Sequence, residues 1–162
     1  MIKLSFTAVF IINQVKFKRI VNGYSARDLS EKISQESQYI SKVESMTSKG
    51  QYTHQILIKI AEVLECSPRD FYPSDEVLQN NSGELVEKKV ISLSNLDDTI
   101  MILLAMQSDG YFSKERSTED LLRYLYILGK PDASVVKEAL SRLVDESKLK
   151  KLGDNFIEIQ YI

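Results

Sequence analysis

The chain has 162 residues, of which 43% are apolar and 27% charged, so its composition is that of a globular protein and argues against disordered, collagen-like and membrane classes. The formal net charge of −2 is unevenly distributed, because residues 1–60 carry nine Lys/Arg against four Asp/Glu and residues 61–162 carry twelve against nineteen. A basic segment joined to an acidic one hints at a polyanion-binding module attached to a second module.

The first predicted element is a helix from about Thr7 to Asn22, which begins inside the apolar run Phe6 to Ile12. That run is too short to cross a membrane and has no small-residue cleavage site after it. We therefore expect no membrane association. Because the chain has one cysteine and no disulfide, we also expect a reducing, cytoplasmic location.

Four further helices are expected before Pro73. Ser25 is a good N-cap for a short second helix, and a third, residues 37–46, has one apolar face. An apolar fourth helix spans Ile56 to Leu64, and Ser67-Pro68 places a cap and a first-turn proline ahead of a short fifth. The polar stretch 79–84 then indicates a flexible connection.

The second half begins with a possible strand, Lys89 to Leu93, followed by three helices. Asn95 to Asp98 cap the first, Ser117 or Thr118 caps the second, and the third covers residues 132–146. Two alternating segments around Gly153-Asp154-Asn155 predict a terminal hairpin. We therefore predict a domain at 1–75, a linker at 76–92 and a second domain at 93–162.

Three segments of the first domain carry a family resemblance: Gly23 to Ile33 (GYSARDLSEKI), Tyr39 to Glu44 (YISKVE) and Leu57 to Ala61 (LIKIA). Together they resemble the Xre family of Cro and phage-repressor-type helix-turn-helix proteins, over about residues 15–72. The resemblance implies a five-helix domain whose third helix enters the major groove of DNA. The second domain resembles a winged helix in outline. The expected fold class is mainly α: a five-helix Cro/repressor-like helix-turn-helix domain followed by a small winged-helix-like α+β domain.

Within this frame, the third helix presents Ser37, Gln38 and Lys42 as candidate contacts to base edges. Gln can pair with adenine and Lys can donate to guanine, whereas Ser is a permissive contact. Candidate phosphate contacts are Arg27, Ser45 and Lys49. The resulting prediction is a sequence-specific transcriptional regulator of bacterial or phage type, a repressor that reads double-stranded DNA as a homodimer. The alternative is a protein-interaction adaptor or antitoxin-like partner binder in which DNA contact is weak or lost.

No enzyme, cofactor or metal site is expected. His54 and Cys66, the only residues of their types, have no partners for a zinc site, and Asp97-Asp98 at a helix start is explained as a cap. The second domain has an acidic third helix, so we expect it to support dimerisation or to bind a protein partner through a surface near Tyr124 and Tyr126. An equally simple interpretation is that these tyrosines are core and rim residues. A contact of this domain with DNA also remains open, through Lys148, Lys150 and Lys151 of the predicted hairpin.

Overall fold

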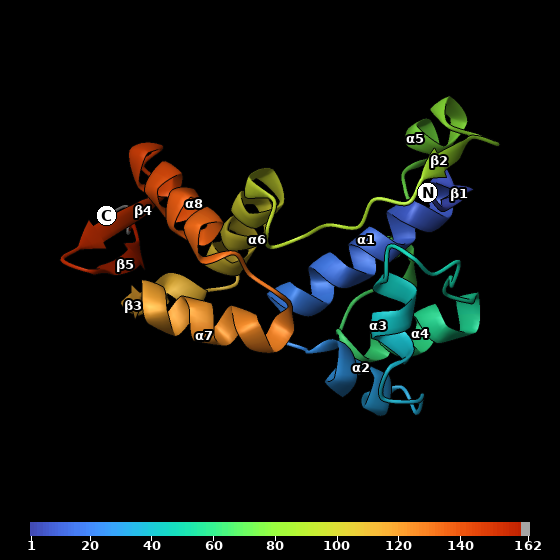
Figure 1. Ribbon diagram of the computed structural model, residues 1–162, viewed down its shortest axis with the longest axis horizontal. Coiled ribbons are helices and arrows are strands. Elements are labelled where there is room, and N and C mark those ends of the chain that lie inside the picture. Colours follow the sequence, from blue (N-terminus) through green and yellow to red (C-terminus); the bar gives the residue numbers. More distant parts are fainter. Residues whose placement is uncertain (160–162) are drawn as a thin grey trace. The chain divides into compact units, whose positions relative to one another are not determined.

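The computed structural model describes residues 1–159 and is mainly helical, with small antiparallel sheets. The chain divides into two compact units, which we call unit 1 (Met1–Ile91) and unit 2 (from Ser92 onward) (Figure 1). Within the described range, no helix combines the length and the apolar character needed to cross a membrane.

Unit 1 consists of short helices arranged around one long helix, with a two-stranded sheet. Its elements are β1 (Lys3–Ser5), α1 (Phe6–Val21), α2 (Ala26–Lys32), α3 (Tyr39–Glu44), α4 (His54–Val63), the 3-10 helix η1 (Pro68–Phe71), α5 (Asp75–Asn80) and β2 (Leu85–Glu87). The sequence predicts several of their starts correctly, because Ser25 accepts the backbone N–H of Asp28 and Ser67 forms a capping box with Asp70.

Helix α1 is the centre of unit 1, since its side chains enter both of its apolar clusters. The larger cluster comprises Ile11, Val15, Leu29, Ile33, Ile40, Leu57, Ile60, Ala61, Leu64 and Phe71. The smaller cluster comprises Leu4, Ala8, Val9, Ile12 and Val43. Residues of α3 contribute to both, so α3 is packed between them.

The predicted linker at 76–92 is wrong over much of its length. Helix α5 (Asp75–Asn80) overlaps the start of the flexible connection predicted at 79–84. The strand predicted at 89–93 is absent, and strand β2 lies earlier, at Leu85–Glu87. Strand β2 pairs antiparallel with β1, with Lys3 opposite Glu87. Because the sheet partner of β2 is the first strand of the chain, unit 1 extends to Ile91 rather than ending at residue 75.

Unit 2 contains the three predicted helices and the predicted hairpin. Its elements are α6 (Leu96–Ser108), the 3-10 helix η2 (Tyr111–Ser113), β3 (Arg116–Ser117), α7 (Thr118–Leu128), α8 (Ala133–Asp145), β4 (Leu149–Leu152) and β5 (Asn155–Glu158). The strands form one antiparallel sheet in the order β3-β5-β4. Strand β3 was not predicted, because two residues are too few to show a period. The last three residues of the predicted hairpin lie outside the described residues.

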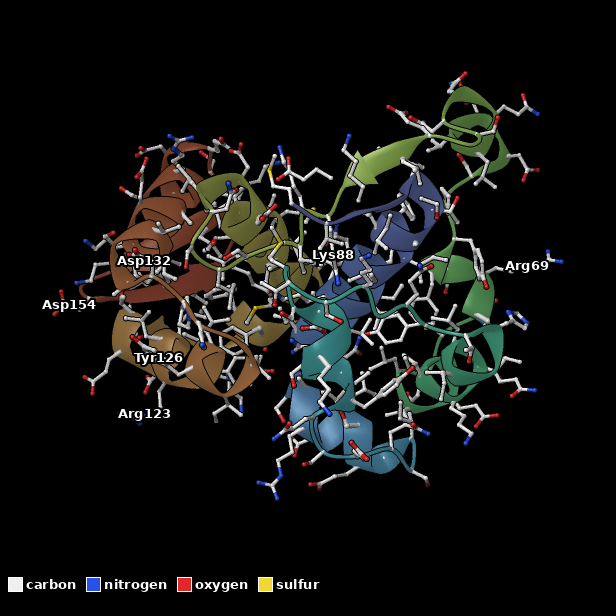
Figure 2. The ribbon with its side chains drawn as sticks, turned by 45° about the vertical axis from the view of Figure 1, so that its right-hand side comes forward. Arg69, Lys88, Arg123, Tyr126, Asp132 and Asp154 are labelled. Atoms are coloured by element: carbon white, nitrogen blue, oxygen red, sulfur yellow. The ribbon has the colours of Figure 1, made fainter. Side chains whose placement is uncertain are left out.

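The two tyrosines singled out on α7 have different environments. Tyr124 is half-buried against Tyr111, with ring centroids 5.0 Å apart, and Arg116 lies over the Tyr111 ring. Tyr126 is 60% exposed and the adjacent Ile127 is 64% exposed (Figure 2). The exposed apolar surface of α7 therefore includes Tyr126 and Ile127, whereas Tyr124 is partly buried against Tyr111.

Candidate nucleic-acid interface

Helix α3 is shorter than the predicted helix at 37–46 and has one buried and one exposed face. Ile40 and Val43 are buried, whereas Ser41 and Lys42 are exposed. Gln38 occupies the N-cap position without a capping hydrogen bond from its side chain. Ser37 lies just before it, in a turn closed by the N–H of Tyr39 donating to the carbonyl of Glu36. Two predicted base contacts thus precede the helix, and the third lies on its exposed face.

The N-terminal end of α3 is held by a serine of the preceding helix. The Ser30 hydroxyl is fully buried, donates to the carbonyl of Ala26 at 2.7 Å and accepts the N–H of Ile40 at 3.0 Å. An exposed helix start would leave that N–H to water, whereas here α2 supplies its acceptor. Ser30 therefore fixes the entry of α3 relative to α2.

The chain between these two helices also contains a left-handed residue. Ser34 has φ of 58°, directly after the C-cap residue Ile33. This position usually holds glycine, because a Cβ atom is strained there. The N–H of Gln35 returns to the carbonyl of Ser30 at 2.9 Å, which closes the end of α2 and starts the turn toward α3.

The C-terminal end of α3 is held by a buried ion pair. Arg19 of α1 donates from Nε and Nη2 to the two carboxylate oxygens of Glu44, and both side chains are less than a tenth exposed. Nη1 of the same guanidinium donates to the carbonyl of Tyr24 at 3.2 Å. A two-pronged arginine–carboxylate pair fixes orientation as well as distance. It sets how far α3 is rotated against α1, and with it which side chains reach solvent.

The candidate phosphate contacts lie on α2 and on the loop after α3. Arg27 is exposed and donates to Glu31 at 2.8 Å, and this hydrogen bond raises the pKa of the arginine. The Ser45 hydroxyl accepts the N–H of Thr47 and lies 3.0 Å from the Thr47 hydroxyl. Lys49 is exposed in the same loop. Helices α2 and α3 pack against each other, so Arg27 is carried by the element next to the candidate base contacts.

Acidic side chains accompany the candidate contacts. Lys42 lies 3.5 Å from Glu36, and both side chains are mostly exposed. Residues 25–49 contain four Lys/Arg and four Asp/Glu, so this segment is neutral overall. Exposed ion pairs of this kind are weak, so a phosphate can replace the carboxylate that pairs with Arg27 or with Lys42. Any phosphate that contacted Arg27 or Lys42 would therefore have to replace an existing ion pair.

The charge asymmetry along the chain is smaller when it is counted by structural unit. Unit 1 carries twelve Lys/Arg against eleven Asp/Glu, or +1, and unit 2 carries nine against twelve, or −3. The difference from the sequence count arises because acidic residues of α4, η1, α5 and β2 belong to unit 1. Within this unit, α5 and β2 lie at the N-terminal end of α1, whereas α2 follows its C-terminal end (Figure 1). The acidic residues of α5 are thus placed away from α2.

Sequence reasoning missed the residues that hold α3. The signal that could have found them is a polar residue inside an apolar helical pattern. Three residues fit that description: Ser30, Arg19 and Glu44. A polar residue on a buried face needs a partner. Pairing Arg19 with Glu44 required knowledge of how α1 crosses α3.

Replacing Ser30 tests whether its hydroxyl holds α3. The Ser30→Ala variant is expected to lower the free energy of unfolding by about 1–3 kcal/mol, because the buried N–H of Ile40 loses its acceptor. Ser41→Ala is the matched control, since the exposed Ser41 hydroxyl only donates to Gln38 within the same short segment. Urea denaturation of the two variants measures both effects, and equal losses would contradict the assignment.

Unit 2 has a hollow between α8 and the hairpin that the sequence did not predict. Its lining includes Lys137 and Ser141 of α8 and Lys151 of β4, and its volume is about 270 Å³. Glu138, the next residue of α8 after Lys137, forms an ion pair with Arg142, with 3.0 Å between Oε1 and Nη2. Lys137 and Lys151 thus lie at one hollow, two of the nine Lys/Arg of this acidic unit.

Comparison with known proteins adds no assignment. No protein-family model, curated protein or solved structure matches the chain.

Proposed function

We propose that the protein is a sequence-specific DNA-binding regulator of transcription, a cytoplasmic repressor of bacterial or phage type. In this proposal unit 1 is a helix-turn-helix domain and unit 2 is a winged-helix-like domain. The observation that carries it is the presentation of α3: a six-residue helix, too short to be stable alone, is fixed at both ends by buried polar contacts while Gln38 and Lys42 stay exposed.

This arrangement suits the reading of a duplex. Base-edge contacts discriminate only when the side chains that make them are held in one register, and the phosphate contacts supply that register. Here Arg27 on α2 and Lys49 after α3 flank Gln38 and Lys42 in the sequence and lie on adjacent elements. The Gln side chain offers a donor and an acceptor to adenine, and the lysine offers donors to guanine.

The proposal includes a homodimer formed through unit 2. Tyr126 and Ile127 are exposed on α7. Glu119 and Asp120 begin this helix and Lys130 follows its end. When two copies of α7 lie antiparallel, the acidic start of one meets the basic end of the other, as a two-fold interface requires. A second copy of this chain therefore fits the charges as well as the apolar side chains.

Base readout and phosphate contact are distinguished by two alanine variants. Selection from random duplexes with the purified protein gives its preferred site, on which Gln38→Ala is expected to cost about 1–3 kcal/mol and to relax preference at one base pair. The substitution leaves α3 intact, because the Gln38 side chain makes no capping hydrogen bond. Arg27→Ala should weaken binding to all duplexes similarly and reduce the dependence on salt by about one phosphate contact.

Gel-shift titrations over several salt concentrations measure these effects. Losses that are equal and independent of sequence in both variants would mean that residues 37–42 do not read bases.

The alternative function is a protein-interaction adaptor. The neutral charge of residues 25–49 and the exposed Tyr126 and Ile127 favour it. No binding to any duplex at low salt is the result that would select this alternative.

A further inference from the structure

Lys88, directly after β2, is a buried cation inside unit 1. It is 1% exposed, and its Nζ donates to the carbonyl of Val43 at 2.6 Å and to the carbonyl of Ser48 at 2.8 Å. Burial lowers the pKa of this amine, and the nearby Glu44 carboxylate acts in the opposite direction. One ammonium group thus joins the last turn of α3 to the loop that follows it.

The first of these contacts falls where α3 ends. In a continuing helix the carbonyl of Val43 would accept the N–H of Thr47. Instead that N–H donates to the Ser45 hydroxyl, and Ser45 is extended with ψ of 133°. The carbonyl of Val43 accepts a hydrogen bond from the Nζ of Lys88. Lys88 therefore replaces the hydrogen bond that would have carried the helix on to Met46.

The segment that carries Lys88 is itself fastened to unit 1. The N–H of Lys88 donates to the carbonyl of Ile2, and the side chain of Asn13 on α1 donates to the carbonyl of Lys89 at 2.9 Å and accepts the N–H of Ile91 at 2.8 Å. The ammonium is consequently placed from α1, the helix that also supplies Arg19. It holds its two carbonyls at a fixed position.

The loop placed by this contact carries two of the candidate phosphate contacts. Ser45 and Lys49 lie on either side of the Ser48 carbonyl, and the N–H of Val90 contacts the sulfur of Met46 at 3.3 Å. A residue that only filled space here could be apolar, since burying a cation costs free energy. What the ammonium adds is a fixed relation between the end of α3 and this loop.

We propose that Lys88 is a positioning residue for DNA recognition: by joining Val43 to Ser48 it sets the loop of Ser45 and Lys49 against the exposed face of α3. The proposal rests on the proposed function. It makes the last segment of unit 1 part of the support of this surface, although Lys88 itself does not reach DNA.

The test compares Lys88→Met with Lys89→Met in the full chain. Both variants remove one positive charge from adjacent positions, but Lys89 is exposed and its side chain has no place in this contact. Affinities are measured for the duplex selected by the wild type and for an unrelated duplex of the same length, at a temperature where circular dichroism shows each variant folded. Lys88→Met is expected to lose at least about fivefold in affinity for the selected duplex, the value of about one base contact, with little change on the unrelated one. Lys89→Met should lose equally little on both.

The ratio of the two affinities separates positioning from stability, because a merely structural role lowers the melting temperature without changing the ratio. An unchanged ratio in Lys88→Met, in a wild type that selects a site, overturns the inference and leaves the proposed function standing. A wild type that selects no site overturns both. If Lys88→Met does not fold, Lys88→Gln replaces it, since a neutral amide on a side chain one atom shorter removes the charge and cannot reach both carbonyls. The same selective loss is expected, and an unchanged ratio in that variant overturns the inference.

Discussion

Glu44→Ala is expected to lower the free energy of unfolding of unit 1 by about 3–5 kcal/mol, because it leaves the buried Arg19 guanidinium without its carboxylate. Urea denaturation followed by circular dichroism measures this loss. Since Glu44 also fixes the rotation of α3, affinity for the selected duplex should fall with it even at temperatures where the variant is folded.

Glu36→Ala is the matched control for this substitution. It breaks the ion pair with Lys42, but both of these side chains are mostly exposed, so the expected loss is below about 1 kcal/mol. The double variant Arg19→Met, Glu44→Leu removes both buried charges and should recover much of the stability lost in Glu44→Ala. A loss in Glu44→Ala no greater than that in Glu36→Ala would contradict the burial of the pair.

A fragment of residues 1–91 is expected to lose a factor of about 100 or more in affinity for a two-half-site duplex, while its affinity for a single half-site stays that of the full chain. The physical reason is the effective concentration of the second half-site contact, which in the proposed dimer exists only while unit 2 joins two copies. The fragment must extend to Ile91, because one that ends near residue 75 also removes β2 and Lys88. Ile127→Asp in the full chain should reproduce most of the loss, since it places a charge on the exposed apolar surface of α7.

Light scattering on the full chain, the fragment and Ile127→Asp gives the oligomeric state directly. A monomeric full chain would contradict the proposed dimer. Tight binding of duplex DNA by isolated residues 92–162 would instead make the α8 hollow, with Lys137 and Lys151, a second DNA-binding surface.

Local signals in the sequence predicted most elements correctly, because each depends on neighbouring residues. The caps at Ser25 and Ser67 satisfy N–H groups two or three residues away, and Gly23, with φ of 78°, lies just past the end of α1. Helix α1 begins and ends within one residue of the prediction. Turn chemistry likewise located the terminal hairpin at Gly153, whose φ is 59°.

Long-range contacts account for what the sequence did not predict. Residues 85–91 were assigned to a linker because their partners are distant in the sequence: Val86 pairs with Leu4, and the N–H of Ile91 donates to Asn13. Where α3 ends, the Val43 carbonyl accepts from Lys88, a contact that no periodicity within α3 could indicate. The candidate base contacts could be proposed because they lie at the start and on the polar face of a recognisable helix, whereas the residues that hold that helix were missed because their partners lie on other elements.

The pairing of β1 with β2 also sets the order in which the molecule can be completed during synthesis. Lys3 meets Glu87 across about 80 residues, so β1 has no partner until the ribosome has made nearly all of unit 1. Closing so long a loop is slow, although its entropic cost rises only with the logarithm of its length. Helices α1 to α4 are synthesised first, together with Arg19 and Glu44, and Lys88 is among the last residues of the unit to arrive. The residues of α3 are therefore synthesised before Lys88, which contacts the last turn of the helix. The loop after α3 can take its final position only when residues 85–91 have been made.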